Sequence, residues 1–92
     1  MKLSEDTAVQ KAKADLASRL KIGEGEVKTN SVSKTEFPDM ALGASVGGEM
    51  SAQMISTGWI IKLSANGKNY EYRADKYHLR LVGFNGKNYV IN

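Results

Sequence analysis

The residues that could do chemistry are few in this chain. His78 is the only histidine and there is no cysteine, so thiolate catalysis, disulfides and Cys-ligated metals are excluded. The strand pairing derived below from the hairpin turns places His78 on the outer face of a sheet, opposite Arg73. There a neighbouring cation disfavours imidazolium, and no carboxylate orients the ring. We therefore interpret His78 as a surface strand residue, and we expect no catalytic residues and no enzyme activity.

Two other features bear on ligand binding. Glu36 and Asp39 flank Pro38, but two carboxylates without histidine or further oxygen ligands make a poor transition-metal site. We expect Asp39 to shape the turn after Pro38 by accepting backbone hydrogen bonds. Segment 43–48 is rich in glycine, yet it lacks the Lys-Ser/Thr of a phosphate-binding loop and does not open a helix. The sequence therefore predicts neither a metal nor a cofactor.

The elements that must position these residues are clearest in the last third of the chain. The pentapeptide Asn-Gly-Lys-Asn-Tyr occurs twice, at residues 66–70 and 85–89. Asn-Gly between alternating apolar residues is a strong signal for a two-residue hairpin turn, because both residues tolerate positive φ. The sequence therefore predicts an antiparallel meander, with a final short strand at 87–91 that lies at an edge or is partly frayed.

The turns also predict a register. With Asn66-Gly67 as a turn, the facing pairs are Leu63 with Tyr70, Ile61 with Tyr72, and Lys62 with Glu71. With Asp75-Lys76 as the next turn, they are Tyr72 with Leu79, Tyr70 with Leu81, and Glu71 with Arg80. Apolar pairs then share one face and charged pairs the other, and a one-residue slip would mix the faces. The predicted core face comprises Trp59, Ile61, Leu63, Tyr70, Tyr72, Leu79 and Leu81.

The N-terminal part predicts one helix and one strand. Apolar residues recur at helical spacing over residues 4–21, with Ser4 as N-cap and Gly23 as the left-handed residue after the helix. Residues 27–37 read as a strand with a bulge near Asn30-Ser31, ended by Pro38. The expected fold class is α+β: an N-terminal helix packed on an antiparallel sheet of four to five strands, in a two-layer roll.

The bulk composition sets limits on the protein class. A chain of 92 residues is expected to form a single domain, residues 1–92, with one core. No apolar run approaches the ~20 residues needed to span a bilayer, and the first residues lack the apolar region of a signal peptide. Residues 1–58 carry seven basic and eight acidic residues, whereas 59–92 carry six basic and two acidic. The meander is therefore mildly basic, without the clustered stripe of a dedicated nucleic-acid binder.

Four blocks of the sequence, in order, resemble a small uncharacterised bacterial and archaeal domain of secreted proteins and lipoproteins. The blocks are Ala-Lys-Ala-Asp-Leu-Ala-Ser-Arg-Leu at 12–20, Phe-Pro-Asp-Met-Ala-Leu-Gly-Ala at 37–44, Thr-Gly-Trp-Ile-Ile-Lys-Leu at 57–63 and Tyr-Glu-Tyr-Arg at 70–73. Ala44 stands where the pattern has cysteine, Arg73 replaces a histidine, and the tail from Gly83 is additional. The resemblance implies an extracytoplasmic setting, in the cell envelope or secreted, and a plan similar to cystatin-like and PepSY-like domains.

The segment 38–58 is the main candidate for a binding site. It has no clear period and few charges, and loops longer than ~15 residues are usually functional or disordered. Methionine is adaptable and recurs on surfaces that bind apolar partners. Two other interpretations stay open: Met40, Leu42 and Met54 could pack into the core, and Met50, Ala52 and Met54 alternate as in a short strand. The candidate partner-binding residues are Phe37, Asp39, Met40, Leu42, Met50 and Met54.

We accordingly expect a non-enzymatic binding module that contacts a protein or peptide through the loop 38–58 or through a sheet edge. A peptidase-inhibitor-like domain is one version of this. The alternative is binding of nucleic acid or another polyanion through the basic C-terminal sheet. Nucleic acid is the less favoured partner, because the register puts Tyr70 and Tyr72 on the core side, away from Lys62 and Arg80. The protein is expected to be a monomer or a weak homodimer.

Overall fold

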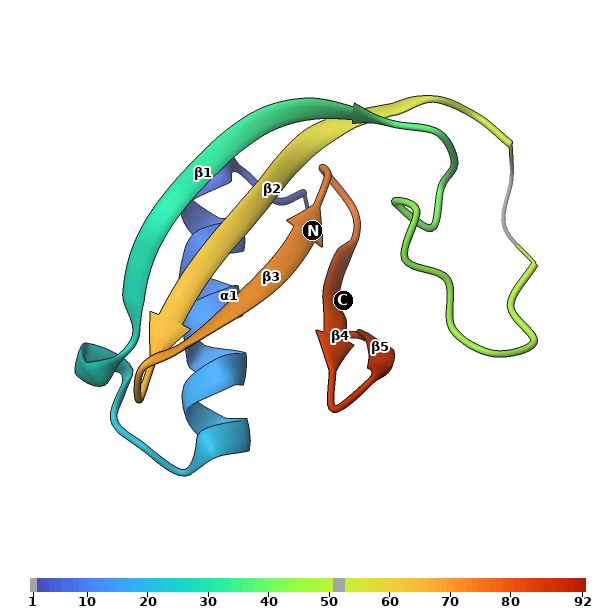
Figure 1. The fold of residues 1–92 in the computed structure, drawn as a ribbon. Helices are drawn as coiled ribbons and strands as arrows, with labels where there is room; N and C mark the ends of the chain where they lie inside the picture. Colours follow the sequence, from blue (N-terminus) through green and yellow to red (C-terminus); the bar gives the residue numbers. More distant parts are fainter. Residues whose placement is uncertain (1, 51–52) are drawn as a thin grey trace.

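The computed structural model describes residues 2–50 and 53–92, and in these residues one α-helix packs on a five-stranded sheet (Figure 1). The strands are all antiparallel and follow the order β1-β2-β3-β4-β5. The elements are α1 (Glu5–Leu20), the 3-10 turn η1 (Glu24–Glu26), β1 (Lys28–Phe37), β2 (Ser56–Ala65), β3 (Lys68–Ala74), β4 (Leu79–Phe84) and β5 (Lys87–Val90). The predicted α+β class, with a helix on an antiparallel sheet, is confirmed.

The ends of α1 follow from local hydrogen bonds. Ser4 is the N-cap as predicted, and its hydroxyl accepts a hydrogen bond from the backbone N–H of Thr7. Glu5 and Asp6 lie in the first turn, where the helix dipole favours negative charge. The prediction for the C-terminal end was wrong: Lys21, with φ 57°, is the left-handed residue, whereas Gly23 has φ −75°. The left-handed residue that ends the helix is therefore Lys21, two residues before the predicted Gly23.

The main core lies between α1 and one face of the sheet. The helix contributes small residues, Ala8, Ala12 and Ala17, and the larger Leu16, all of which are buried. Small side chains let the helix approach the sheet closely. Of the predicted core face, Ile61, Leu63, Tyr72, Leu79 and Leu81 are fully buried, while Trp59 and Tyr70 are partly buried and pack against the cluster.

Two predicted features of the sheet are confirmed. The β2–β3 hairpin turns at Asn66-Gly67, both with positive φ, and its pairs include Leu63 with Tyr70 and Lys62 with Glu71. In the β1–β2 ladder the register shifts between Thr29 and Ser31, which is the predicted bulge. The bulge lets the strand on either side of it keep its apolar residues on the core side.

The predicted register of the β3–β4 hairpin was wrong by two residues. Tyr72 pairs with Leu81 and Arg73 with Arg80, because the turn residues are Lys76 and Tyr77. The Asp75 carboxylate accepts hydrogen bonds from the N–H groups of Tyr77 and His78, which is typical of Asp at the first position of a type I turn. A shift of two residues keeps every side chain on its face, so the predicted core face survives. The predicted pairs of Glu71 with Arg80 and of Arg73 with His78 do not form.

The β4–β5 hairpin turns at Asn85-Gly86 as predicted, and β5 is an edge strand. Its ladder is irregular between Leu81 and Phe84. Within this stretch Gly83 has φ +68°, and its N–H donates to the side-chain oxygen of Asn88. The bulge bends the end of β4 and, with it, the hairpin.

Candidate functional site

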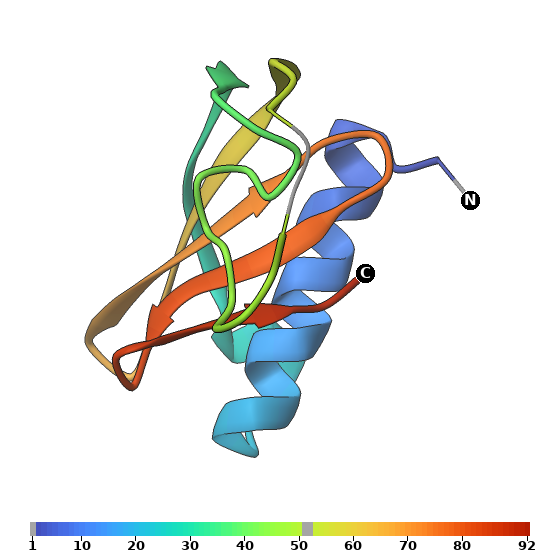
Figure 2. The same ribbon diagram turned by 90° about the vertical axis from the view of Figure 1, so that its right-hand side faces the viewer.

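The segment between β1 and β2 lies on the sheet face opposite α1 (Figures 1 and 2). Its position is fixed from the sheet by side chains of β3, β4 and β5. Arg73 Nη1 donates to the carbonyl of Leu42 at 2.9 Å, and the Asn88 amide donates to the carbonyl of Ser45 at 3.0 Å. Both bonds reach the loop backbone, so they hold its path rather than one side chain.

Arg80 on β4 makes the strongest of these attachments. Its guanidinium forms a two-pronged ion pair with Glu49 of the loop, with Nη2 at 2.6 Å from Oε2, and Nη1 also donates to the carbonyl of Ala44 at 3.3 Å. The hydrogen bonds from Arg80 lower the pKa of Glu49 from 4.5 to about 2, helped by the N–H of Val46. Arg80 is only 5 % exposed, so its charge depends on this partner for compensation.

The inner side of the loop is packed and tightly turned. Ala41, Leu42 and Ala44 are fully buried, as is nearly all of Phe37 at the end of β1. The Asp39 carboxylate accepts the N–H groups of Ala41 and Gly43 at 2.9 and 3.0 Å, in the turn role that the sequence predicts. These residues do not belong to the cluster beneath α1, so their burial comes from the folding of the loop.

The outer side of the loop is apolar and exposed. Met50 is 98 % exposed, Met54 64 % and Ile55 72 %. Met54 and Ile55 line a hollow of about 290 Å³ together with Met40 and Tyr77, the latter from the β3–β4 turn. The loop therefore combines a packed inner side with large apolar side chains that face solvent.

The six candidate residues are thus divided by the structure. Phe37 and Leu42 are buried, Asp39 is taken up by its turn, Met40 is half-buried, and Met50 and Met54 are exposed. Of the two alternatives, core packing holds for Leu42 and not for Met54. The short strand through Ala52 falls on a residue outside the described part. The sequence analysis did not assign Arg80, Glu49, Ile55 or Tyr77 to the site. An arginine in mid-strand and an acidic residue in the middle of a loop with few charges were available signals.

The surroundings of His78 differ from the prediction. Its Nδ1 lies 2.9 Å from Oδ1 of Asp75, so a carboxylate does orient the ring, and Arg73 is not its strand partner. Ser56 Oγ donates to the other oxygen of Asp75 at 2.5 Å. Burial alone would raise the pKa of Asp75, but the hydrogen bonds from Ser56, Tyr77 and His78 outweigh burial and lower it. Ser56 and His78 therefore bind the same carboxylate and not each other, an arrangement that fixes the turn and leaves the hydroxyl without an imidazole base.

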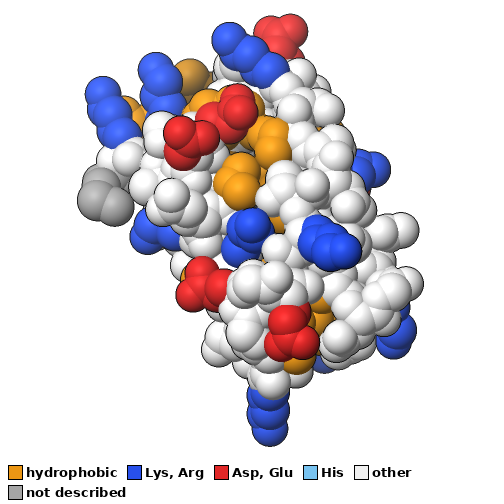
Figure 3. Space-filling view, turned by 90° about the vertical axis from the view of Figure 1, so that its left-hand side faces the viewer, with side chains coloured by type: hydrophobic (Ala, Val, Ile, Leu, Met, Phe, Trp, Pro, Cys, Tyr) orange, Lys and Arg blue, Asp and Glu red, His pale blue; other side chains and the backbone are white. Residues whose placement is uncertain are grey.

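The basic C-terminal sheet offers fewer available cations than its sequence indicates. Of the six basic residues in 59–92, Arg73 and Arg80 hold the loop, which leaves Lys62, Lys68, Lys76 and Lys87. On the β1 side of the molecule, which Figure 3 shows, Lys and Arg side chains are dispersed among Asp and Glu. Within residues 2–50 and 53–92, no three His, Cys, Asp or Glu residues gather as metal ligands would. In the same residues, no helix has the length and apolar character needed to cross a membrane.

The fold and the loop define a small α+β domain with a long, attached loop between its first two strands. The chain belongs to the family described as Domain of unknown function (DUF8738), which it matches over residues 9–82. This range includes α1 from Val9 onward, the loop and most of β4. No curated protein and no solved structure matches the chain.

Proposed function

We propose that the protein is a non-enzymatic module that binds a protein or peptide through the outer side of the loop. The contact surface, here called the loop surface, comprises Met50, Met54, Ile55 and Tyr77. One observation carries the proposal: a loop whose inner side is packed exposes Met54 and Ile55 around a shared hollow, and Met50, which precedes them in the loop, is 98 % exposed. Single exposed apolar residues are ordinary, but neighbouring ones around a shared hollow are typical of interaction sites.

The attachment of the loop supports binding in a second way. Arg80 with Glu49, and Arg73 with the Leu42 carbonyl, hold the loop before any partner arrives. Binding to a fixed loop loses less conformational entropy than binding to a disordered one. Methionine adds adaptability, since its flexible thioether chain fits partners of different shape. The loop surface therefore follows a stretch that the sheet holds, residues 42–49, and adds adjustable methionine side chains.

The chemistry of the hollow indicates the partner. Apolar side chains line it, and Lys76 also borders it, while the neighbouring Asp75 is buried and hydrogen-bonded. A partner that places one apolar side chain in the hollow, with an acidic residue beside it, matches both features. The resemblance noted above supports a setting in the cell envelope or outside the cell. A peptidase-inhibitor-like role is one version of the proposal and rests on the resemblance to cystatin-like domains noted from the sequence.

The test compares two immobilised variants with the wild type. In the double variant Met54→Gln and Ile55→Thr, the loop surface becomes polar while the attachments of the loop stay intact. The matched control is Val90→Thr, because Val90 is also exposed, at 50 %, but lies on β5. Extracts of the source organism's envelope and culture fluid are passed over all three, and retained proteins are identified by mass spectrometry.

The proposal requires a protein that wild type and Val90→Thr retain and the double variant does not. Circular dichroism first establishes that all three proteins are equally folded. Identical retention by all three proteins would overturn the proposal, as would loss with the Val90 control alone.

A further inference from the structure

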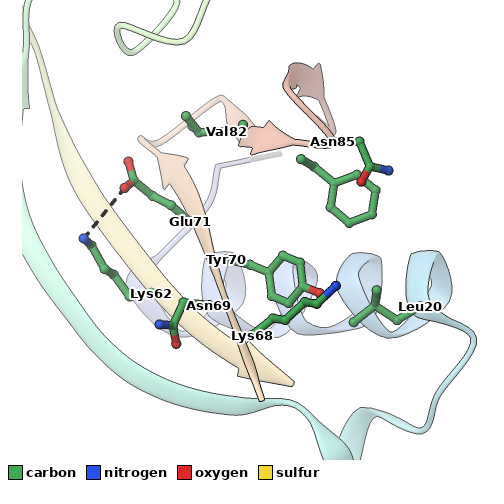
Figure 4. Close-up of a pocket in the computed structure, with 10 residues that line it drawn as sticks. Leu20, Lys62, Lys68, Asn69, Tyr70, Glu71, Val82 and Asn85 are labelled. Carbon is green, nitrogen blue, oxygen red and sulfur yellow. Dashed lines mark ion pairs between the residues drawn. The ribbon is translucent and has the colours of Figure 1, made fainter. Parts of the chain in front are cut away.

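A second candidate site lies where β3 and β4 separate. Their ladder ends at the pair Glu71 with Val82, although β3 itself continues back to Lys68. Beyond Val82, the left-handed Gly83 bends β4 away. The gap between the strands is a cleft of about 500 Å³, which is in the size range of ligand-binding pockets. Figure 4 shows its lining residues on both strands and on α1.

The backbone of Asn69 points into this cleft. Lys68 pairs with Ala65 directly across the two-residue turn, so its own N–H and C=O point toward β2. The backbone N–H and C=O groups of successive residues point to opposite sides of a strand, so the N–H and C=O of Asn69 and Glu71 point toward β4. The bond from Asp75 N–H to the His78 carbonyl fits this alternation. Among the described residues Asn69 has no strand partner on that side, so one donor and one acceptor stand ready at ladder spacing.

The two faces of the cleft differ in chemistry. On the side of α1, the rings of Tyr70 and Phe84 lie 6.0 Å apart and form an apolar floor, and the Lys68 side chain runs alongside Tyr70 (Figure 4). On the outer side, Lys62 is only loosely paired with Glu71, at 3.8 Å, and Glu71 is held more closely by Arg73 at 2.8 Å. Lys68 is in no ion pair among the described residues, so it is the cation available to a ligand.

We propose that this cleft binds a short extended peptide with an acidic residue, in the pattern apolar–x–acidic. The central residue completes the ladder opposite Asn69, and its side chain faces outward. In the antiparallel orientation, the residue before it lies over Tyr70 and Phe84, and the residue after it lies beside Lys68. The proposal is independent of the loop surface, which lies in a different part of the molecule.

A peptide fits the cleft better than a nucleic acid does. A peptide backbone presents its donor and acceptor in the geometry of the antiparallel ladder that Asn69 leaves open. Base stacking needs an open aromatic face, whereas the Phe84 ring packs against Tyr70 and edge-on against Tyr89. The Arg19 guanidinium, 4.4 Å from the centre of the Tyr89 ring, covers part of the same cluster. The rings therefore act as a floor for a side chain.

The test is a titration of the intact, isotope-labelled protein, followed by amide NMR. The probe is a capped pentapeptide, valine-leucine-threonine-glutamate-valine, and its control has lysine in place of glutamate. Two variants change the cleft. Lys68→Glu reverses the charge. Asn69→Pro removes the backbone N–H that points into the cleft, at a position without a strand partner on that side, where proline is tolerated. Asn69→Ala keeps that N–H, and Lys34→Glu reverses a charge on β1, away from the cleft. A single-stranded oligothymidine serves as the polyanion probe.

The proposal predicts that the glutamate peptide shifts the amide signals of β3 residues 68–71 and of Val82 to Asn85. Lysine in the peptide, or Lys68→Glu in the protein, weakens binding at least about fivefold, the ratio for an exposed ion pair of about 1 kcal/mol. Asn69→Pro weakens binding while Asn69→Ala and Lys34→Glu leave it unchanged. Equal binding of both peptides, or stronger displacement of the signals by oligothymidine, would overturn it. The Met54→Gln and Ile55→Thr variant binds the peptide normally, which separates this site from the loop surface.

Discussion

Truncation of Leu42 tests whether the loop is part of the folded structure. Leu42 is fully buried, and removal of such a side chain typically costs about 2–5 kcal/mol of unfolding free energy. Small domains have unfolding free energies of about 5–15 kcal/mol. Leu42→Ala is therefore expected to remove a large part of this protein's unfolding free energy. A loop resting loosely on the surface would lose almost nothing.

The backbone at Leu42 supplies a second, sharper test. Leu42 has φ 60°, a conformation that costs a residue with a β-carbon about 1–2 kcal/mol and glycine almost nothing. Leu42→Gly loses one more methyl group than Leu42→Ala, worth about 0.8 kcal/mol, but relieves this strain. The greater entropy of glycine in the unfolded chain, about 0.4–1 kcal/mol, offsets most of the remaining relief. The glycine variant is therefore expected to be about as stable as the alanine variant, whereas at a site with negative φ it would be clearly less stable.

The assay is urea unfolding followed by the fluorescence of Trp59, the single tryptophan, which packs against the main core from β2. Wild type, Leu42→Ala and Leu42→Gly are compared at equal slope of the transition, so that differences in midpoint report stability. A loss below about 0.5 kcal/mol for Leu42→Ala, the size of an ordinary surface change, would refute the packing of the loop. An alanine variant clearly more stable than the glycine variant would refute the left-handed backbone.

Three further predictions follow from single contacts. Glu49 has a pKa near 2, below its ordinary 4.5, so its pairing stabilises the protein above pH 4.5 and is lost as the pH falls toward 2; the melting temperature of Glu49→Gln should lie below that of wild type at pH 6 and converge with it near pH 2. A β-carbon on Gly58 would lie 1.9 Å from the Ala74 carbonyl oxygen, whereas one on Gly47 would meet nothing; urea unfolding should show a loss of at least about 2 kcal/mol for Gly58→Ala and little change for Gly47→Ala. Tyr72→Phe removes a 2.7 Å hydrogen bond to Asp15 and should cost about 1.5–3 kcal/mol by the same assay, because the acceptor is charged; a loss no larger than that of a surface substitution would contradict this contact.

The parts of the fold that the sequence predicted correctly are those set by local chemistry. Asn66-Gly67 requires positive φ at two adjacent residues and so fixes the β2–β3 register. The β3–β4 turn has no such residues, and its position depends on where the Asp75 side chain finds backbone N–H groups. Assigning Asp75 to the turn itself, rather than to the position before it, displaced the register by two. The same difference explains why the environment of His78 was predicted incorrectly.

The loop could be located from the sequence but its structure could not. Composition marked segment 38–58 as unusual, and the Asp39 turn followed from local rules. The contacts that fix the loop join residues far apart in the chain, such as Glu49 with Arg80. Such a pairing depends on the tertiary path of the loop, which no periodicity encodes. For the same reason, burial of Leu42 and exposure of Met54 were not distinguishable from residue type.

The most direct test of the proposed function places a photo-crosslinking amino acid at position 54 of the full chain. A matched protein carries it at position 90, which is exposed on β5. Both are illuminated in the source organism's envelope and culture fluid, and crosslinked products are identified by mass spectrometry. The account predicts a discrete protein adduct from position 54 that is absent from position 90. The same adducts from both positions, or none from position 54, would contradict it.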